Sequence, residues 1–108
     1  MPDLPEFEIE FDPAKNEANQ KKHKVDFVTA SLVFADRYRL ERLDRSVGNP
    51  GEERWQTLGM VDRILFVVYV EKAGNVRRIV SARLATRAEK RCYYGNDQND
   101  RQGWAEAN

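Results

Sequence analysis

The sequence has little of the residues on which several common classes of site depend. Cys92 is the only cysteine and His23 the only histidine in 108 residues. An internal disulfide is therefore impossible, and a metal site built from clustered histidine and cysteine ligands is not expected. A lone thiol is more often packed or idle than nucleophilic. We expect a packed Cys92, no metal or other cofactor, and a reducing cytoplasm as the compartment.

Long apolar runs are also missing. No stretch of about 18 apolar residues occurs, so no membrane span is expected. Residues 1–6 are acidic and lack the basic start and apolar stretch of a secretory signal. The chain also lacks a P-loop and a dinucleotide-binding fingerprint. Membrane attachment and nucleotide-cofactor chemistry are therefore not expected.

The formal net charge is zero, but the charges are unevenly distributed. Residues 72–91 contain seven basic residues and one acidic residue, Glu89, whereas residues 1–10 contain four acidic residues and no basic one. A nucleic-acid site needs a local basic surface rather than a net positive charge. The segment therefore favours RNA binding, although an ordinary solvated charged face would show the same pattern.

The apolar and turn residues predict an α+β fold. Asp12 and Pro13 begin a surface helix that ends near His23, and Asp26 caps a second helix with a core-facing apolar side. Thr86 and Glu89 form the capping box of a last helix, which ends near residue 94. Apolar patterns predict strands at residues 6–11, 37–44, 54–60, 64–70 and 76–83, with a loop at 46–51 and a hairpin turn at 72–75.

The short connections between strands predict a small antiparallel sheet with helices packed on it. Residues 1–95 are expected to form one domain. Residues 96–108 are polar and are expected to be a disordered tail apart from Trp104.

Cleavage of RNA without a metal needs a base for the 2′-hydroxyl, cations for the phosphorane and an acid for the leaving 5′-oxygen. Lys15, Lys22 and His23 share one face of the first predicted helix with Asn19 and could meet a phosphate there. A solvated polar face remains the alternative, because a lone histidine is usually not catalytic.

Alternation places Arg83 on one side of its strand together with Arg77, Ile79 and Ser81. An arginine beside apolar neighbours needs an anion, which is either a substrate phosphate or an internal carboxylate such as Glu53. Arg87 lies in the first turn of the last helix, where a cation opposes the helix dipole, and this favours another use for it.

For three aromatic residues, the sequence is compatible with two roles. Trp55 is either part of the core or stacks on a base. Tyr93 and Tyr94 are either packing residues or a proton donor and a base stacker.

An ordered set of segments runs along the chain: Phe11–His23 with its Lys, Asn, Asn and Lys-His pattern, Val25–Phe27, Val33–Asp36, Glu53–Trp55 with Gly59, Val67–Tyr69, Ile79–Arg83, Ala85–Glu89 and Tyr93. Over about residues 7–94, this set resembles the BrnT family of toxins. The sequence departs from the family at Lys24, where the family usually has glycine after the histidine. Glycine would end the helix with a positive φ at low cost. With lysine at this position, we expect a change in how the chain leaves the helix and therefore in the orientation of the His23 side chain.

The resemblance implies a RelE-like fold and a metal-independent endoribonuclease that stops translation. It also implies neutralisation by a ribbon-helix-helix antitoxin, with two toxins on one antitoxin dimer and DNA contacted only through the antitoxin. The catalytic residues are predicted to be His23, Lys22, Arg54, Arg83 and Tyr93, and the RNA-binding residues Lys15, Arg77 and Arg87. The alternative is a non-catalytic basic module of the same fold that binds its partner, or a toxin that has lost activity.

Overall fold

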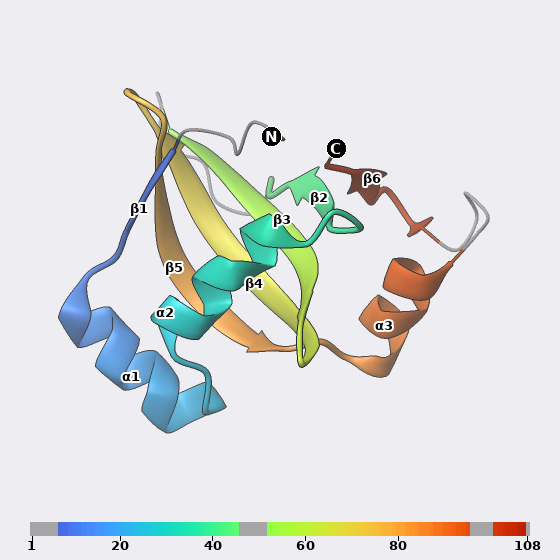
Figure 1. Ribbon diagram of the computed structural model, residues 1–108, viewed down its shortest axis with the longest axis horizontal. Helices are drawn as coiled ribbons and strands as arrows, with labels where there is room; N and C mark the ends of the chain where they lie inside the picture. Colours follow the sequence, from blue (N-terminus) through green and yellow to red (C-terminus); the bar gives the residue numbers. More distant parts are fainter. Residues whose placement is uncertain (1–6, 46–51, 96–100, 108) are drawn as a thin grey trace.

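The computed structural model describes residues 7–45, 52–95 and 101–107. The described elements are, in chain order, β1 (Glu8–Glu10), α1 (Pro13–His23), α2 (Phe27–Ala30), the 3-10 helix η1 (Ser31–Ala35), β2 (Leu40–Leu43), β3 (Glu53–Val61), β4 (Arg63–Lys72), β5 (Val76–Leu84), α3 (Arg87–Tyr94) and β6 (Ala105–Glu106). In the described part of the chain, the strands form one sheet in the order β1-β5-β4-β3-β2-β6 (Figure 1). The expected α+β class is confirmed.

Strand β4 separates two apolar cores, because its successive side chains point to opposite faces of the sheet. Leu65, Val67 and Tyr69 belong to the first core, which α2 and η1 cover (Figure 1). The intervening residues Ile64 and Phe66 belong to the second core, which also contains the following residues from β2, β3, α3 and the C-terminal segment: Leu40, Leu58, Cys92 and Trp104. The expected packed thiol is confirmed, since Cys92 is buried.

Gly59 sets how closely η1 approaches the sheet. A Cβ atom at this position would lie 2.7 Å from the Cβ of Val33. Real Cβ atoms do not come that close, so only glycine allows this contact between β3 and η1.

Two buried or half-buried asparagines hold α1 in place. The Asn19 side chain donates to the carbonyls of Val25 and Ala82, at 2.9 and 2.8 Å, and accepts from the Ala82 N–H at 3.2 Å. Asn16 donates to Asp26, the N-cap of α2, and accepts from the N–H of Phe27. Asn19 therefore fixes the second half of α1 beside β5, and Asn16 joins α1 to the start of α2.

The prediction of an antiparallel sheet is wrong at one edge, where β1 pairs with β5 in parallel. Short loops impose antiparallel pairing only on strands joined by a hairpin. β1 and β5 are separated by α1, α2, η1 and three strands, so no hairpin fixes their relative direction.

The prediction of a disordered tail is wrong for residues 101–107. Trp104 is buried against Phe66, and β6 pairs with β2. Arg42 also lies over the Trp104 ring, with its guanidinium carbon 4.2 Å from the ring centroid. Trp104 was the expected exception, but the polar composition gave no sign of the two-residue strand that follows it. Residues 96–100 and 108 lie outside the described residues, as does the loop expected at 46–51.

Strand β2 begins at Leu40 rather than at Arg37. Residues 36–39 form a turn, in which the Asp36 side chain accepts from the N–H of Tyr38 at 2.9 Å. An aspartate that accepts from the backbone two residues on stabilises a turn instead of a strand. The turn places Asp36 and Tyr38 at one end of the sheet.

A β-bulge changes which residues of β5 share a face. Tyr69 of β4 lies opposite Ile79, whereas the preceding Val68 lies opposite Ser81, so Val80 is an extra residue. An inserted residue shifts the alternation of all residues after it. Arg77 consequently lies over rings of the first core and Arg83 over Phe66 of the second. The prediction that both arginines share one side is wrong for this reason.

Candidate functional site

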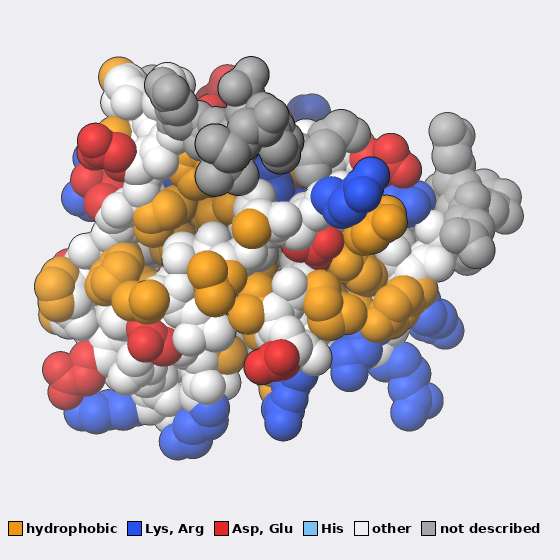
Figure 2. Space-filling model, viewed as in Figure 1, with side chains coloured by type: hydrophobic (Ala, Val, Ile, Leu, Met, Phe, Trp, Pro, Cys, Tyr) orange, Lys and Arg blue, Asp and Glu red, His pale blue; other side chains and the backbone are white. Residues whose placement is uncertain are grey.

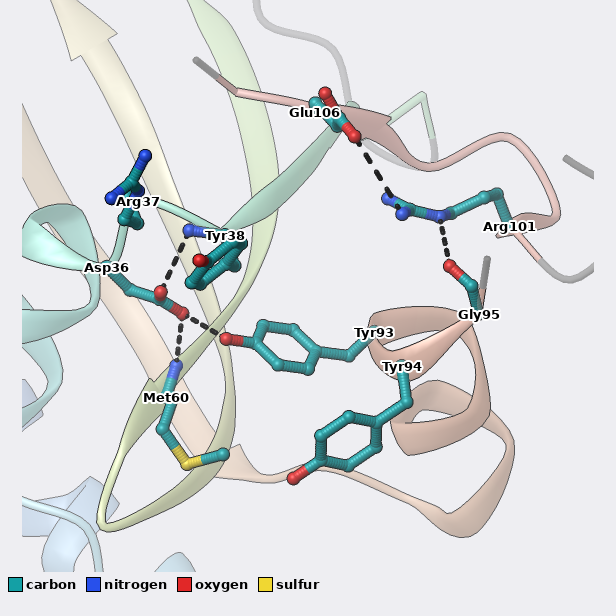
Figure 3. A pocket seen from close by; sticks show the side chains of 9 residues that line it. All are labelled: Asp36, Arg37, Tyr38, Met60, Tyr93, Tyr94, Gly95, Arg101 and Glu106. Carbon is teal, nitrogen blue, oxygen red and sulfur yellow. Dashed lines mark hydrogen bonds and ion pairs between the residues drawn. The ribbon is translucent and has the colours of Figure 1, made fainter. Parts of the chain in front are cut away.

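A cavity of about 810 Å³ opens where the Asp36 turn meets the end of α3. Figure 3 shows the side chains that line it. They are Asp36, Arg37, Tyr38, Met60, Tyr93, Tyr94, Gly95, Arg101 and Glu106. The lining combines three tyrosine rings with two carboxylates and two arginines, so it offers apolar surface together with a few polar groups, as ligand sites do.

The Asp36 carboxylate organises this cavity. One of its oxygens, Oδ1, accepts from the N–H of Tyr38, and the other, Oδ2, accepts from the N–H of Met60 at 2.8 Å and from the Tyr93 hydroxyl at 2.5 Å. The side chain therefore connects the turn, β3 and α3 (Figure 3).

Tyr93 is held as a neutral hydrogen-bond donor. Burial raises the pKa of its hydroxyl, and the hydrogen bond to Asp36 and the charge of that carboxylate raise it further. A tyrosine in this state gives up its proton reluctantly. The geometry therefore uses Tyr93 to position Asp36, and its predicted role in catalysis stays a prediction.

Two more tyrosine rings face the cavity and remain open to solvent. Tyr38 is 67% exposed and Tyr94 is 63% exposed. The Tyr94 ring packs edge-on against Tyr93, with a centroid distance of 5.3 Å. In Figure 3, Tyr38 and Tyr94 lie on either side of Tyr93. The Arg37 guanidinium lies over the Tyr38 ring, 5.4 Å from its centroid. The open face of each of the two rings can stack on an aromatic ligand.

A second, smaller cavity of about 410 Å³ adjoins the first, because Met60 and Tyr94 line both. Its other lining residues come from the β3–β4 turn, β4, the end of β5 and α3, namely Asp62, Arg63, Ile64, Leu84 and Lys90. The two cavities therefore adjoin at Met60 and Tyr94, and the smaller one is lined by the cations Arg63 and Lys90.

Two exposed cations, Arg63 and Lys90, line this smaller cavity. We use the name basic edge for Lys22 of α1, Arg63 at the start of β4, and Arg87 and Lys90 of α3. All four are exposed, and none forms an ion pair within the described part of the chain. Figure 2 shows Lys and Arg side chains along the lower margin of the molecule, below α1, the β3–β4 turn and α3. Such a surface attracts a polyanion.

Of the other residues predicted on α1, His23 ends the helix and is partly exposed, and Lys15 is exposed nearer the start. Because Asn19 fixes α1 beside Ala82, His23 lies one helical turn further along, near the end of β5. Asn19 is buried and serves the fold, whereas Lys15 and Lys22 are exposed, so the expected common helix face stays a prediction. The predicted action of Lys15, Lys22 and His23 on RNA stays a prediction.

Arg83 has an internal carboxylate partner, one of the two alternatives left open by the sequence, and that carboxylate belongs to Glu89 rather than to Glu53. Its two terminal nitrogens donate to the two Glu89 oxygens at 2.8 and 2.9 Å. Burial alone would raise the pKa of Glu89, but the hydrogen bonds from Arg83 and the Thr86 backbone outweigh it and lower the pKa. The Arg83 side chain keeps about a third of its surface exposed, so it is paired but reachable.

Arg77 and Arg54 do not join the basic edge. Arg77 stacks over Phe7, Phe34 and Tyr69, and its Nη1 is buried without a hydrogen-bond partner. Arg54 lies opposite Val70 of β4, while Arg83 lies opposite Phe66. Four residues of a strand separate these positions by about 13 Å. No contact in the described residues joins Arg54, Arg83 and α1 at one point.

The sequence analysis missed Asp36 and Tyr38 as site residues and left Tyr94 between packing and stacking. The available signal was the aspartate that follows the second helix, because an aspartate there is typical of a turn. Trp55 is half-buried against the first core, so its packing interpretation holds. The described residues contain no group of three or more His, Cys, Asp and Glu side chains that could hold a metal ion.

Comparisons with known proteins support one family. A family model described as the ribonuclease toxin BrnT of type II toxin–antitoxin systems matches residues 11–89. The fold is similar to a crystal structure of the Brucella abortus ribonuclease toxin BrnT, with a TM-score of 0.55 and 18% sequence identity. That match covers 75% of this chain and 99% of the other. No curated protein sequence matches this chain significantly.

Proposed function

The chain belongs to the BrnT family of ribonuclease toxins of type II toxin–antitoxin systems, and from that premise we propose that it is a metal-independent endoribonuclease. It cleaves single-stranded RNA, and the cleavage inhibits translation until an antitoxin binds. The observation that carries this proposal is the basic edge beside a tyrosine-lined cavity. Exposed aromatic rings next to unpaired cations are the two features that single-stranded RNA binding requires.

The proposed reaction needs side chains that bind phosphate groups and side chains that transfer protons. The basic edge and Lys15 bind phosphates, and the paired but reachable Arg83 stabilises the charge of the phosphorane. His23 serves as the general base or the general acid, with Lys22 beside it. Arg54 and Tyr93 remain proposed catalytic residues of the family pattern, although the geometry gives Tyr93 a positioning role first.

The proposed partner is a ribbon-helix-helix antitoxin, with two toxins on each antitoxin dimer and DNA contacted only by the antitoxin. We place its contact on the basic side of the molecule, where an acidic segment would be attracted by the unpaired cations. Strand β1 is a less favourable place, because its Glu8 is acidic and the cations beside it, Lys72 and Arg78, are already paired with Glu10. The cytoplasm is the proposed compartment, and none of the helices in the described part of the chain is long and apolar enough to cross a bilayer.

The decisive experiment is an RNA cleavage assay on purified, antitoxin-free protein with EDTA in the buffer. Cleavage that persists in EDTA, and that stops when the antitoxin is added, supports the proposal. The Arg83→Ala and Glu89→Gln variants form a matched pair, because both break the same ion pair but only the first removes the guanidinium. A catalytic Arg83 predicts that the first variant loses activity by about tenfold or more while the second retains most of it.

A non-catalytic binding module is the second candidate. It is favoured by the engagement of Arg83 with Glu89 and of Tyr93 with Asp36, which leaves two proposed catalytic groups bound within the protein. Such a module would bind RNA with a steep dependence on salt and leave it intact. Intact RNA after prolonged incubation, with and without EDTA, would establish this reading.

A further inference from the structure

The larger cavity is lined by two carboxylates and two arginines, namely Asp36, Glu106, Arg37 and Arg101. Arg101 pairs with Glu106, and the charged group that is bonded to the Tyr93 hydroxyl is the Asp36 carboxylate, which repels an anion. Two further cations, Arg63 and Lys90, line the adjoining smaller cavity. A nucleotide placed across the two would set its phosphate at the smaller cavity and its base in the larger one.

The rings of the larger cavity suit a base. Tyr38 and Tyr94 line the cavity and keep most of their surface open to solvent. Arg37 lies over the Tyr38 ring, so a base would stack on the other face of that ring. Tyr93 is fixed by its hydrogen bond to Asp36 and holds Tyr94 through an edge-on contact. Aromatic stacking contributes to binding of any nucleobase and does not select one.

Selection comes from the Asp36 carboxylate. A carboxylate has two oxygens with about four acceptor positions in total. Three positions are filled, by the N–H groups of Tyr38 and Met60 and by the Tyr93 hydroxyl. Oδ1 carries only one of these bonds, so it can accept one more donor from a ligand in the cavity.

We propose that this cavity is a nucleobase subsite that accepts bases with an exocyclic amino group and disfavours uracil. The proposal rests on the proposed RNA-cleaving function and names the base preference of that site. Cytosine, adenine and guanine each offer an amino N–H to Oδ1. Uracil offers one ring N–H flanked by two carbonyl oxygens, which the negative carboxylate repels.

Cytidine and uridine 5′-monophosphate are the matched probes, because their rings differ in the amino group at position 4 and the adjacent ring nitrogen. We expect isothermal titration calorimetry on the wild-type protein to show that the cytidine nucleotide binds about fivefold tighter or more, since one polar mismatch at a base edge costs about 1–3 kcal/mol. Adenosine and guanosine monophosphates should group with cytidine. Equal affinities for cytidine and uridine monophosphates, or no binding of either, overturn the proposal.

Variants locate the binding to this cavity. Tyr38→Ala and Tyr94→Ala should each weaken binding of the cytidine nucleotide by about fivefold or more, whereas the Phe variants retain the ring and should bind normally. Leu32→Ala, at a residue of η1 that is 56% exposed, is the control and should change nothing. Unchanged binding in both alanine variants would place the nucleotide elsewhere and overturn the assignment.

The experiments distinguish failure of this proposal from failure of the proposed function. Nucleoside monophosphates contain no phosphodiester bond, so their binding is measured independently of RNA cleavage. Selective nucleotide binding with no RNA cleavage would retain the subsite and reject the ribonuclease. Cleavage of RNA with equal binding of the two pyrimidine nucleotides would retain the ribonuclease and reject the subsite.

Discussion

Lys24 occupies a backbone conformation that few side chains tolerate. Its φ is 62° and its ψ is 26°, and its N–H donates to the Gln20 carbonyl to close α1. Glycine takes this left-handed conformation without steric cost, whereas other residues pay about 1 kcal/mol. The lysine therefore keeps the helix end that glycine would give, and the departure from the family pattern does not redirect the chain.

We predict that Lys24→Gly stabilises the protein by about 0.5–1 kcal/mol in urea unfolding, because it removes this strain. Ala18→Gly, at an exposed position inside α1, is the control and should lower stability by a similar amount. A lower stability of Lys24→Gly would mean that the lysine side chain, which donates to the Lys21 carbonyl, contributes more than the strain costs.

Residues whose partners are near in sequence were predictable, and those with distant partners were not. Asp12, Asp26 and Thr86 cap their helices as expected, since each accepts from an N–H two or three residues on. Asn19 reaches Ala82, 63 residues away, and its spacing from Lys15 gave no sign of this. Asp36 likewise makes its turn locally but meets Tyr93 only in the fold.

The connection between β5 and α3 depends on one carboxylate. Glu89 accepts from Arg83 of β5 and from the Thr86 N–H, which completes the capping box of α3. Because its pKa is lowered from 4.5, the folded state favours the charged form. The stabilisation is thus complete above about pH 4.5 and is lost as the pH falls through the lower pKa of the folded state.

We predict that Glu89→Gln lowers the free energy of unfolding by about 1–2 kcal/mol at pH 7. The difference from wild type should shrink at pH 3.5, because the stabilisation by the charged carboxylate falls once the pH is below the unfolded-state pKa of about 4.5. Urea unfolding at the two pH values measures this. Glu52→Gln, at an exposed carboxylate, is the control and should differ little from wild type at either pH. If Glu89→Gln lowers the free energy of unfolding by the same amount at both pH values, the charge of Glu89 is not the cause of the stabilisation.

Among the secondary-structure elements, the helices and the hairpin strands were predicted well from local patterns, because each follows from nearby residues. The bulge at Val80 was not visible, since an apolar β-branched residue continues the strand pattern without interruption. It moved Arg83 to the face where Glu89 lies, and so it decided which carboxylate the arginine meets. The parallel β1 and the short β6 depend on contacts between distant segments, which composition does not report.

Over the whole molecule, zero net charge hides a separation of paired from unpaired cations. Lys72 and Arg78 share the Glu10 carboxylate next to β1, at 2.7 and 2.9 Å, so that end of the sheet is locally compensated. The basic edge has no such compensation in the described residues. The basic run at residues 72–91 therefore divides into a structural half and a half open to RNA, which counting charges along the sequence could not separate.

The salt dependence of RNA binding should show this division. Each phosphate contact on a single strand contributes a slope of about −0.7 to the plot of log affinity against log salt. With a 2′-O-methyl RNA, which cannot be cleaved through its 2′-hydroxyl, Lys90→Ala should reduce the slope by about that amount, and so should Arg63→Ala. Lys72→Ala removes a lysine of the same run that is held by Glu10, so its slope should match wild type. Fluorescence anisotropy at several salt concentrations measures all four proteins. If Lys72→Ala lowers the slope and Lys90→Ala does not, RNA binds near β1 rather than at the basic edge. In that case, no RNA phosphate lies at the cavity beside α3.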